Sequence, residues 1–445
     1  MSGPYVGLDA LPDAVAALRP GAVPQDALED ARHALADTLA AAAYTVTTSA
    51  TASALANGVD GPGDGPVGVW WTGRRAHLAD AAFANAYRVH SSDFDSVHYL
   101  SFGHPAAVSL PPLLGLYESG VGDPLCVLVG YVLSVEIMAV LGTTFGAALR
   151  AASFHPTVVL GAPASAASCT WFLGGGARAI RWAMAYAASI TIGFDAHFGS
   201  EIKPLQVAAC ARAGLHAAQL AVGRSRTGPR MPWYAPVATL AGAGSTQPAP
   251  QLHVFGQPWA ARVVPTRCKS LPICGYFDPV LAAWADRPAG LPEPGAVQRV
   301  TVEGPEYLVR ANRFIHPTTL DEARFSLPFL VALLLHHREV TPADCVPARL
   351  ADRGFRRTMA AVDVMPAAAG DPGVIRVFSR DREWSLPLRP LASCPRTSWS
   401  RLQTKLAASG LADRASEIVA HVRAFETSTP TRWRALVSPF EEATT

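Results

Sequence analysis

Through the first 225 residues, apolar side chains recur at spacings of three and four, and glycine or proline marks the joints between these segments. The pattern predicts helices over residues 24–44, 77–90, 106–119, 123–141, 162–173, 177–188 and 205–222. Several of these segments are apolar on almost every face, as helices at the centre of a bundle are. We therefore expect this half of the chain to be almost wholly α-helical.

The pattern changes after about Arg224, where polar stretches rich in proline and glycine carry no sustained period. Alternation of apolar and polar residues predicts half-buried strands over 296–309 and 373–388. Helical spacing returns over 320–336 and 347–360, and again over 398–425. We expect this last stretch to pack back on the first half.

The elements predict a mainly α fold with a large all-α helical-bundle domain and a smaller α+β lid domain. A length of 445 residues exceeds what one hydrophobic core usually supports, which favours two domains. We place the helical domain at residues 1–261, completed by 398–445, and the lid domain at 262–397.

The longest apolar run, residues 125–149, is long enough to cross a bilayer. Glu136 lies near its centre, however, where a carboxylate costs roughly 2.5–3.5 kcal/mol on insertion. Gly142, Thr143 and Thr144 indicate a break into two shorter helices. We therefore expect a buried helical pair and no membrane partner.

The N-terminus has no basic stretch followed by an apolar one, so we expect a cytoplasmic protein rather than a secreted one. Seven scattered cysteines form no CxxC pair, which favours reduced thiols over zinc or redox work.

Composition changes this picture in two ways. Only 16% of the residues are charged, against about 25% in most soluble domains. Because no membrane span is expected, we infer that a second copy covers part of the surface and that the chain forms a homodimer. Lys and Arg number 37 against 35 Asp and Glu, so the net charge of +2 is too small to gather a polyanion. We expect no nucleic-acid partner.

The densest polar cluster of the helical half lies in a joint between two apolar helices. It contains His90, Asp93, Asp95, His98 and His104. Histidine and a carboxylate in such a place are suited to proton transfer near neutral pH, while capping hydrogen bonds between the helices are an equal alternative. A metal site is a weaker alternative, because the spacing of the acids and His98 matches no recognised ligand pattern.

Two further joints carry single candidates. His155 precedes an alanine-rich helix, and Lys203 stands directly before Pro204 and another apolar helix. A cation beside a helix N-terminus suits an anion such as a carboxylate, although a surface lysine is the simpler reading of Lys203 alone. Three polar joints in one bundle favour convergence at one site.

Residues 267–278 combine cations, a tight turn and a terminal carboxylate, and could reach over the first domain. Cys274 has no base nearby to activate it as a nucleophile. The chain has no GxGxxG after a strand, no GxxxxGK[ST], no GxSxG and no HExxH. The chain therefore lacks the main sequence motifs of nicotinamide-dependent enzymes, nucleotide-binding proteins, serine hydrolases and zincins.

The order of these segments resembles that of the MmgE/PrpD family, which includes 2-methylcitrate dehydratase, cis-aconitate decarboxylase and iminodisuccinate epimerase. The resemblance runs through almost the whole chain. It rests on ARHALADTLAAA, WWTGRRAHLADAAFANAYRVHSSDFDS, GHPAAVSLPPLLGL, GYVLSVEIMAVLG, ASFHPTVVLGAPASAAS, EIKPLQVAACARAGLHAAQLA, RCKSLPICGYFDP and DEARFSLPFLVALLL.

The resemblance implies a cofactor-independent enzyme that acts on small polycarboxylic acids, with a site between a helical domain and a lid and with a homodimeric assembly. By this resemblance the catalytic residues are Asp93, His104 and His155. Lys203 would bind a substrate carboxylate, and Tyr307, Lys269 and Asp278 would contribute from the lid. No metal and no cofactor are implied.

Two departures weaken the transfer of one particular reaction. The family commonly reads DFDDT, where this chain has Ser96 and Val97, and the lid motif commonly ends in His, where this chain has Asp278. We expect a lyase or isomerase acting next to a carboxylate of a small organic acid, which could belong to specialised metabolism. The alternatives are a cyclase or dehydratase of a larger, less charged biosynthetic intermediate, and a catalytically silent binding subunit.

Overall fold

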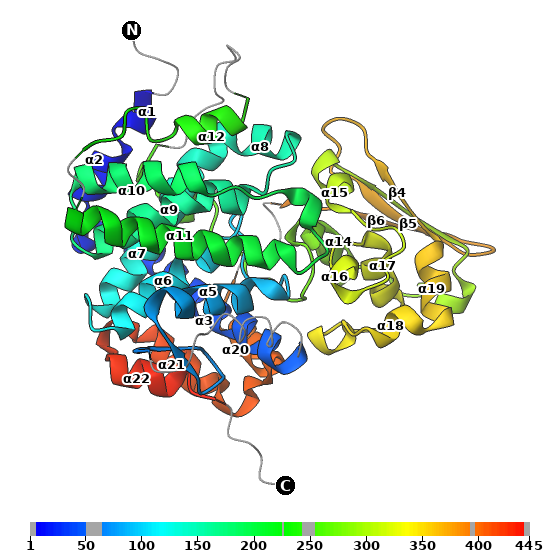
Figure 1. Ribbon diagram of the computed structural model, residues 1–445. Helices are drawn as coiled ribbons and strands as arrows, with labels where there is room; N and C mark the ends of the chain where they lie inside the picture. Colours follow the sequence, from blue (N-terminus) through cyan, green and yellow to red (C-terminus); the bar gives the residue numbers. More distant parts are fainter. Residues whose placement is uncertain (1–5, 50–64, 225–226, 243–253, 392–396, 440–445) are drawn as a thin grey trace.

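The structure is a computed structural model that describes residues 6–49, 65–224, 227–242, 254–391 and 397–439. Its larger part, which we call the helical part, is a bundle formed by the first half of the chain and the C-terminal helices (Figure 1). The long helices are α3 (Gln25–Thr48), α5 (Leu78–Ser91), α6 (Pro105–Glu118), α7 (Pro124–Leu141), α9 (Pro156–Phe172), α10 (Ala177–Ile190) and α11 (Ile202–Arg224).

Shorter helices complete the helical part. These are α1 (Val6–Asp9), α2 (Leu11–Ala17), α8 (Ala147–Ala151), α12 (Ala235–Leu240), α13 (Ala260–Val263), α20 (Trp399–Leu406), α21 (Ala415–Arg423) and α22 (Pro430–Leu436). A two-stranded hairpin, β1 (Val67–Gly68) with β2 (Arg75–Ala76), is a small exception to the all-α expectation.

The smaller part, which we call the sheet part, has a four-stranded sheet in the order β4-β3-β5-β6. Strand β3 pairs in parallel with β4 and antiparallel with β5, and β5 and β6 form a hairpin. The strands are β3 (Arg299–Gly304), β4 (Val362–Pro366), β5 (Val374–Phe378) and β6 (Glu383–Pro387). The mainly α fold class with a small sheet-containing part is confirmed.

The helices of the sheet part cover one face of the sheet, and α14, α16 and α17 lie between the sheet and the bundle (Figure 1). The helices are α14 (Asp278–Ala285), α15 (Glu306–Ala311), α16 (Leu320–Ala323), α17 (Leu327–His336), α18 (Ala348–Ala351) and α19 (Arg353–Ala360).

Two separate clusters of buried apolar residues form the cores. One unites the first-half helices with C-terminal residues such as Leu402, Ile418 and Trp433, and the other joins the sheet to α14, α17 and α19. The domain limits at residues 262 and 397 stay a prediction.

Several predicted elements differ from the structure. The stretch 373–388 forms two strands, β5 and β6, and the helical stretches 320–336 and 347–360 are each divided into two helices. Helix α9 begins at Pro156, six residues before the predicted start, because proline fits the first turn and burial outweighs Pro163 in its interior. The strand predicted over 296–309 ends at Gly304, where Pro305 opens α15. The break predicted near Gly142 is a π-helical turn, Gly142–Gly146, that continues α7 into α8.

The glycines of that turn allow a close approach rather than a break. A Cβ atom at Gly142 would lie 2.2 Å from the carbonyl oxygen of Leu100, and one at Gly146 would lie 2.5 Å from the ring of Phe102. The joint that precedes α6 therefore packs directly on this helix.

One helix of the described residues, Pro124–Ala151, is long and apolar enough to cross a membrane, but 89% of its apolar window is buried inside the protein. Its Glu136 accepts hydrogen bonds from the backbone amides of Gly256, at 2.9 Å, and Ala260. The carboxylate thus has partners within the bundle, as expected for a buried core helix.

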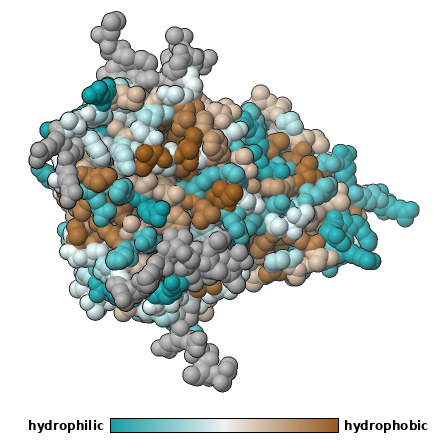
Figure 2. All heavy atoms as spheres, viewed as in Figure 1, coloured by the Kyte–Doolittle hydropathy of each residue, from teal (hydrophilic) through white to brown (hydrophobic). Residues whose placement is uncertain are grey.

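Figure 2 shows several apolar areas on the face of the helical part that carries α10 and α11. Ile190, Ile192, Phe194 and Ile202, in and between these helices, are each more than 40% exposed. The expected homodimer stays a prediction, for which this face is the natural candidate.

A buried ion pair holds the C-terminal helices against the first half of the chain. Lys405 of α20 donates to the carboxylate of Asp37 in α3 and to the carbonyl oxygen of Phe94. Both charged side chains are almost fully buried. Lys405 therefore holds the C-terminal segment and the 92–104 joint against the same helix.

We predict that Lys405→Met destabilises the protein by about 3–5 kcal/mol, because it leaves the carboxylate of Asp37 buried and unpaired. Urea unfolding measures the effect. The double variant Lys405→Met/Asp37→Leu is the control, and it should recover much of the loss because no charge remains buried. Equal stability of the single variant and the wild type would contradict the interpretation.

Candidate active site

Three long helices begin at one place in the helical part. His104 precedes Pro105 at the start of α6, His155 precedes Pro156 at the start of α9, and Lys203 lies in the first turn of α11. Helix N-termini present unpaired amide groups and a partial positive charge, which attract anions. The expected convergence of three polar joints is present in the structure.

The joints themselves have an unusual backbone. Of the non-glycine residues that the structure describes, four have positive φ, and three of them lie in the joints before α6 and α9: Asp93, Phe102 and Ser153. Such conformations cost about 1–3 kcal/mol each and cluster at functional sites. Surrounding contacts must therefore hold these joints in place.

A buried ion triad forms the floor of the site. The Lys203 ammonium lies 2.7 Å from Oδ1 of Asp93, and the Lys269 ammonium lies 2.9 Å from Oδ2 and 2.7 Å from the Asp93 carbonyl oxygen. Burial alone would raise the pKa of Asp93, but the two lysines lower it well below its usual range. Asp93 also keeps Lys269 charged, since its pKa is raised in spite of burial.

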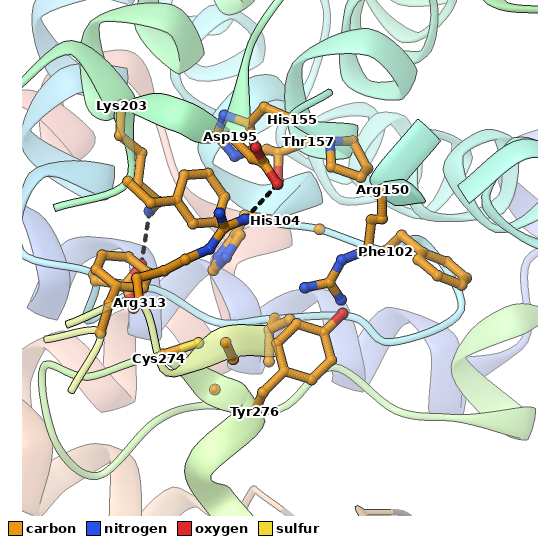
Figure 3. A pocket seen from close by; sticks show the side chains of 18 of the residues that line it. Phe102, His104, Arg150, His155, Thr157, Asp195, Lys203, Cys274, Tyr276 and Arg313 are labelled. Carbon is orange, nitrogen blue, oxygen red and sulfur yellow. Dashed lines mark hydrogen bonds and ion pairs between the residues drawn. The ribbon is translucent and has the colours of Figure 1, made fainter. Parts of the chain in front are cut away.

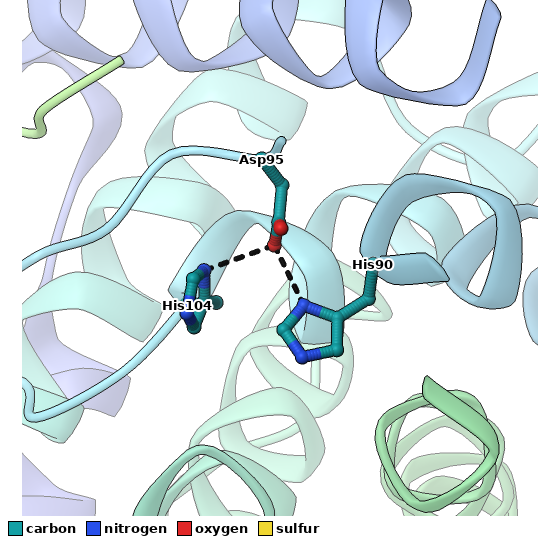
Figure 4. A group of neighbouring side chains, drawn as sticks. All are labelled: His90, Asp95 and His104. Atoms are coloured by element: carbon teal, nitrogen blue, oxygen red, sulfur yellow. Dashed lines mark hydrogen bonds and ion pairs between the residues drawn. The ribbon is translucent and has the colours of Figure 1, made fainter. Parts of the chain in front are cut away.

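Next to the triad, two histidines share one carboxylate oxygen (Figure 4). Oδ2 of Asp95 lies 2.9 Å from Nδ1 of His90 and 3.0 Å from Nδ1 of His104. The second ring nitrogen of His90 lies 2.7 Å from the Lys203 ammonium, which can only donate. His90 therefore donates from Nδ1 and accepts at Nε2.

Burial lowers the pKa of His90 to about 4, so this ring is neutral near pH 7. Burial would raise the pKa of Asp95, but the two adjacent histidines lower it well below its usual range. An ionised Asp95 beside the neutral ring of His90 is consistent with the donor and acceptor roles that the distances require.

His155 is also buried and neutral. Burial, and then the nearby Lys203, lower its pKa well below the usual value. Its Nδ1 lies 3.4 Å from the side-chain oxygen of Gln206, and its ring meets Phe198 edge to face at 4.9 Å. A neutral His155 can hydrogen-bond a ligand, but it is a poor source of protons near pH 7.

These groups line a pocket between the helical part and the sheet part (Figure 3), with an empty volume of about 660 Å³. Its lining is Asp93, Val97, Phe102, Gly103, His104, Arg150, Phe154, His155, Pro156, Thr157, Asp195, Phe198, Lys203, Cys274, Gly275, Tyr276, Ala311, Arg313 and Phe325. The wall includes several aromatic side chains. Lys203 and Arg313 lie on one side of the pocket, and Arg150 lies on the other side, next to Tyr276 (Figure 3).

The structure brings together four of the predicted site residues, Asp93, His104, His155 and Lys203, as pocket-lining groups. Lys269 reaches the site through its contacts with Asp93.

The other two predicted residues lie outside the lining. Asp278 accepts a hydrogen bond from Tyr99 at 3.2 Å, lies 3.7 Å from Arg267 and lines a different groove. Tyr307 lies on α15 behind Tyr276, with 5.6 Å between the ring centroids. Neither residue lines this pocket, and the substrate contacts expected of them stay a prediction.

Sequence reasoning did not select several residues that the structure places here. His90 and Asp95 belonged to the polar cluster, and their spacing of five residues across a helix end was an available signal. Arg150, stacked on Tyr276 with 4.3 Å from Cζ to the ring centroid, and Arg313, paired with Asp195, had no comparable signal. They reach the pocket only because the two parts of the chain pack together.

His90, Asp95 and His104 lie close enough together to be considered as metal ligands. The two nitrogen–oxygen distances are those of hydrogen bonds, however, and the Lys203 ammonium occupies the remaining nitrogen of His90. His98, from the metal alternative, bonds Ser101 at 2.6 Å and the carbonyl oxygen of Val264 at 2.7 Å. Its role is structural.

Comparisons with known proteins agree with this picture. A family model described as the MmgE/PrpD N-terminal domain matches residues 9–235. Cis-aconitate decarboxylase of Homo sapiens is 33% identical over 147 residues, which are 32% of this chain and 30% of that protein. The Mus musculus enzyme of that name is 32% identical over 147 residues, again 32% and 30% of the two chains. The matched segment thus spans about a third of these relatives.

We predict that acid destabilises the protein through His90. Its folded-state pKa of about 4 lies below the value near 6.5 expected on unfolding, so the neutral ring contributes stability above pH 6.5 that is lost as the pH falls to 4. The loss amounts to roughly 3 kcal/mol. Urea unfolding at several pH values should show a shallower acid slope for His90→Gln than for the exposed control His316→Gln. Parallel slopes would contradict the assignment.

Proposed function

Because the chain belongs to the MmgE/PrpD family, we propose that it is a cofactor-independent lyase or isomerase that moves a proton next to a carboxylate of a small organic acid. The observation that carries the proposal is that His104 and Lys203 line the same pocket and are linked through His90 and Asp95. Acid/base chemistry beside a carboxylate needs these two elements, a base and a fixed cation.

The contacts of His104 select the nitrogen that would react. Its Nδ1 lies 2.9 Å from the carbonyl oxygen of Ser96 and 3.0 Å from the carboxylate of Asp95, both of which only accept. Nδ1 therefore carries the proton in the neutral ring, and Nε2 has a free lone pair. His104 lines the pocket with 12% of its side chain exposed, which leaves Nε2 available to a ligand.

Lys203 would hold the substrate carboxylate. Its ammonium has three N–H groups, and two of them are directed at Asp93 and His90, so one remains for the pocket. The two lysines are balanced by Asp93 and the adjacent Asp95, and Arg150 is a further cation on the pocket wall. The adjacent N-termini of α6, α9 and α11 add to the attraction for an anion.

In the proposed reaction, Nε2 of His104 removes a proton from the carbon beside the carboxylate, and the electron pair of the C–H bond stays on that carbon. In a dehydration, this pair forms the C=C bond as hydroxide leaves the neighbouring carbon, and the hydroxide takes the proton held by His104 and departs as water. In an epimerisation, the carbon takes a proton from solvent on its other face. In a decarboxylation, the pair comes from the C–C bond broken on loss of carbon dioxide, and the carbon takes a proton from His104, which must enter this reaction protonated. The cation at Lys203 stabilises the negative charge in each case.

Asp93 has a different role in this proposal from the proton exchange expected of it. Because two lysines keep its carboxylate ionised, it is a weak base and acts by orienting both ammonium groups. His155, which stays neutral, would hydrogen-bond the developing oxyanion or a leaving group.

A second candidate is a cyclase or dehydratase of a larger, less charged intermediate. Val97 lines the pocket where the family commonly has threonine, and the walls include Phe102, Phe154, Phe198 and Phe325. Such walls favour an apolar substituent over a further carboxylate. Turnover of cis-aconitate or 2-methylcitrate at ordinary enzymatic rates would contradict this alternative.

To test the proposal, proton NMR in D2O would follow cis-aconitate, 2-methylcitrate and related di- and tricarboxylates for loss of water, loss of carbon dioxide or deuterium uptake. For the acid that reacts, we predict that His104→Ala lowers the rate 10²–10⁴-fold, roughly the contribution of a general base, with folding intact. His316→Ala is the matched control on an exposed histidine. An unchanged rate in His104→Ala would remove this residue from the mechanism, and carboxylate binding without any reaction would favour a silent binding subunit.

A further inference from the structure

Two buried residues outside the pocket lining, Asp95 and His90, have no place in the reaction described above. Both are at most 1% exposed, and they lie directly behind the pocket groups His104 and Lys203. We propose that Asp95 and His90 are positioning residues that join the base and the carboxylate-binding cation into one unit. The role given to His104 rests on the proposed function.

Asp95 acts first as the counter-ion of His104. When Nε2 takes a proton, the ring becomes an imidazolium whose Nδ1–H faces a carboxylate at 3.0 Å. The Ser96 carbonyl, at 2.9 Å, already fixes the neutral tautomer, so the distinct contribution of Asp95 is its negative charge. In a buried site such a charge stabilises the protonated ring far more than it would in water.

The same oxygen of Asp95 also orders the lysine. Oδ2 accepts from Nδ1 of His90 at 2.9 Å, which leaves Nε2 of His90 to accept from the Lys203 ammonium at 2.7 Å. Asp93 is the second acceptor, so two of the three N–H groups of Lys203 have fixed directions. The direction of the third N–H group is then fixed as well. A substrate carboxylate would meet an ammonium that needs no reorientation.

The link between the two halves is a continuous chain of contacts. It runs from Lys203 through His90 and Oδ2 of Asp95 to His104, with donor–acceptor distances of 2.7, 2.9 and 3.0 Å. The rings of His90 and His104 also meet edge to face at 4.7 Å. A change in the charge of Asp95 must therefore affect both His104 and Lys203.

Carbethoxylation by diethyl pyrocarbonate tests this without any substrate. The reagent modifies the unprotonated ring nitrogen of histidine, and peptide mass spectrometry reports the extent at His104 as a function of pH. The titratable groups around His104 are Asp95 and Asp93 from its own joint, His90 from α5, His155 from α9 and Lys203 from α11. The variant Asp95→Asn removes the charge of Asp95 alone and keeps the shape of its side chain.

In Asp95→Asn we expect the pH of half-maximal modification of His104 to fall by at least one pH unit, because the imidazolium loses its counter-ion. The control is Asp30→Asn, a buried aspartate that bonds Thr266 away from the pocket, for which we expect no shift. Circular dichroism would confirm that both variants fold. The same profile in Asp95→Asn and the wild type would overturn the proposal for Asp95.

His90→Gln tests the second half of the chain. Isothermal titration with tricarballylate, an unreactive tricarboxylate, should give at least tenfold weaker binding than the wild type, as the lysine is no longer aimed. Lys203→Met is the reference variant, because it removes the cation completely. Wild-type affinity in His90→Gln would overturn the role of His90.

These outcomes separate the inference from the proposed function. If tricarballylate fails to bind even the wild type, while Asp95→Asn still shifts the modification of His104, the carboxylate substrate is wrong and the counter-ion role stands. If binding depends on Lys203 but not on His90, the proposed function stands and the linkage fails.

Discussion

The arrangement of this protein depends on the ion triad of Asp93, Lys203 and Lys269. Burying three charges is costly unless each has its partners, and removing any one would leave an uncompensated charge in the interior. The three residues come from the end of α5, the start of α11 and the segment that enters the sheet part. Satisfying the triad therefore fixes where these segments meet, and with them the position of the pocket.

Contacts around the triad hold a joint that is strained on its own. Asp93 has a left-handed backbone, and its neighbour Phe94 is held by Lys405 from the C-terminal helices. Further along, Val97 exchanges two backbone hydrogen bonds of 2.9 Å with Arg267. Segments from three distant regions of the sequence thus support one short joint, as preorganised sites require.

The sequence predicted those features of the structure that depend on residues close together in the chain. Helices and their joints are local features, so periodicity located α3, α5, α7 and α10 to within a few residues. The joints were informative because a polar residue before a proline and an apolar helix has few roles. His104, His155 and Lys203 each precede a proline, and Asp93 belongs to the same polar cluster as His104. These signals made the four residues candidates, and the family resemblance gave them their expected roles.

The remaining site residues depend on how the two parts of the chain pack, which no local pattern records. Arg150 and Arg313 are ordinary arginines until Tyr276 and Asp195 are placed beside them. Asp278 ends a motif that was expected to reach over the first domain, but it bonds Tyr99 and lines a different groove. Pro305 began a helix inside an alternating pattern, which moved Tyr307 from a strand to α15.

Several charged residues of the interior are buried in pairs. In the described part of the chain, Asp37 bonds Lys405 and Asp93 bonds two lysines, so these interior charges are satisfied by the protein itself. At the pocket this pairing is incomplete, since one N–H of Lys203 and Nε2 of His104 have no hydrogen-bond partner among the described residues. One group accepts a proton and the other donates a hydrogen bond, side by side on the wall of one pocket. An acid with a removable proton next to its carboxylate satisfies both at once, which is the physical reason to expect chemistry here rather than binding alone.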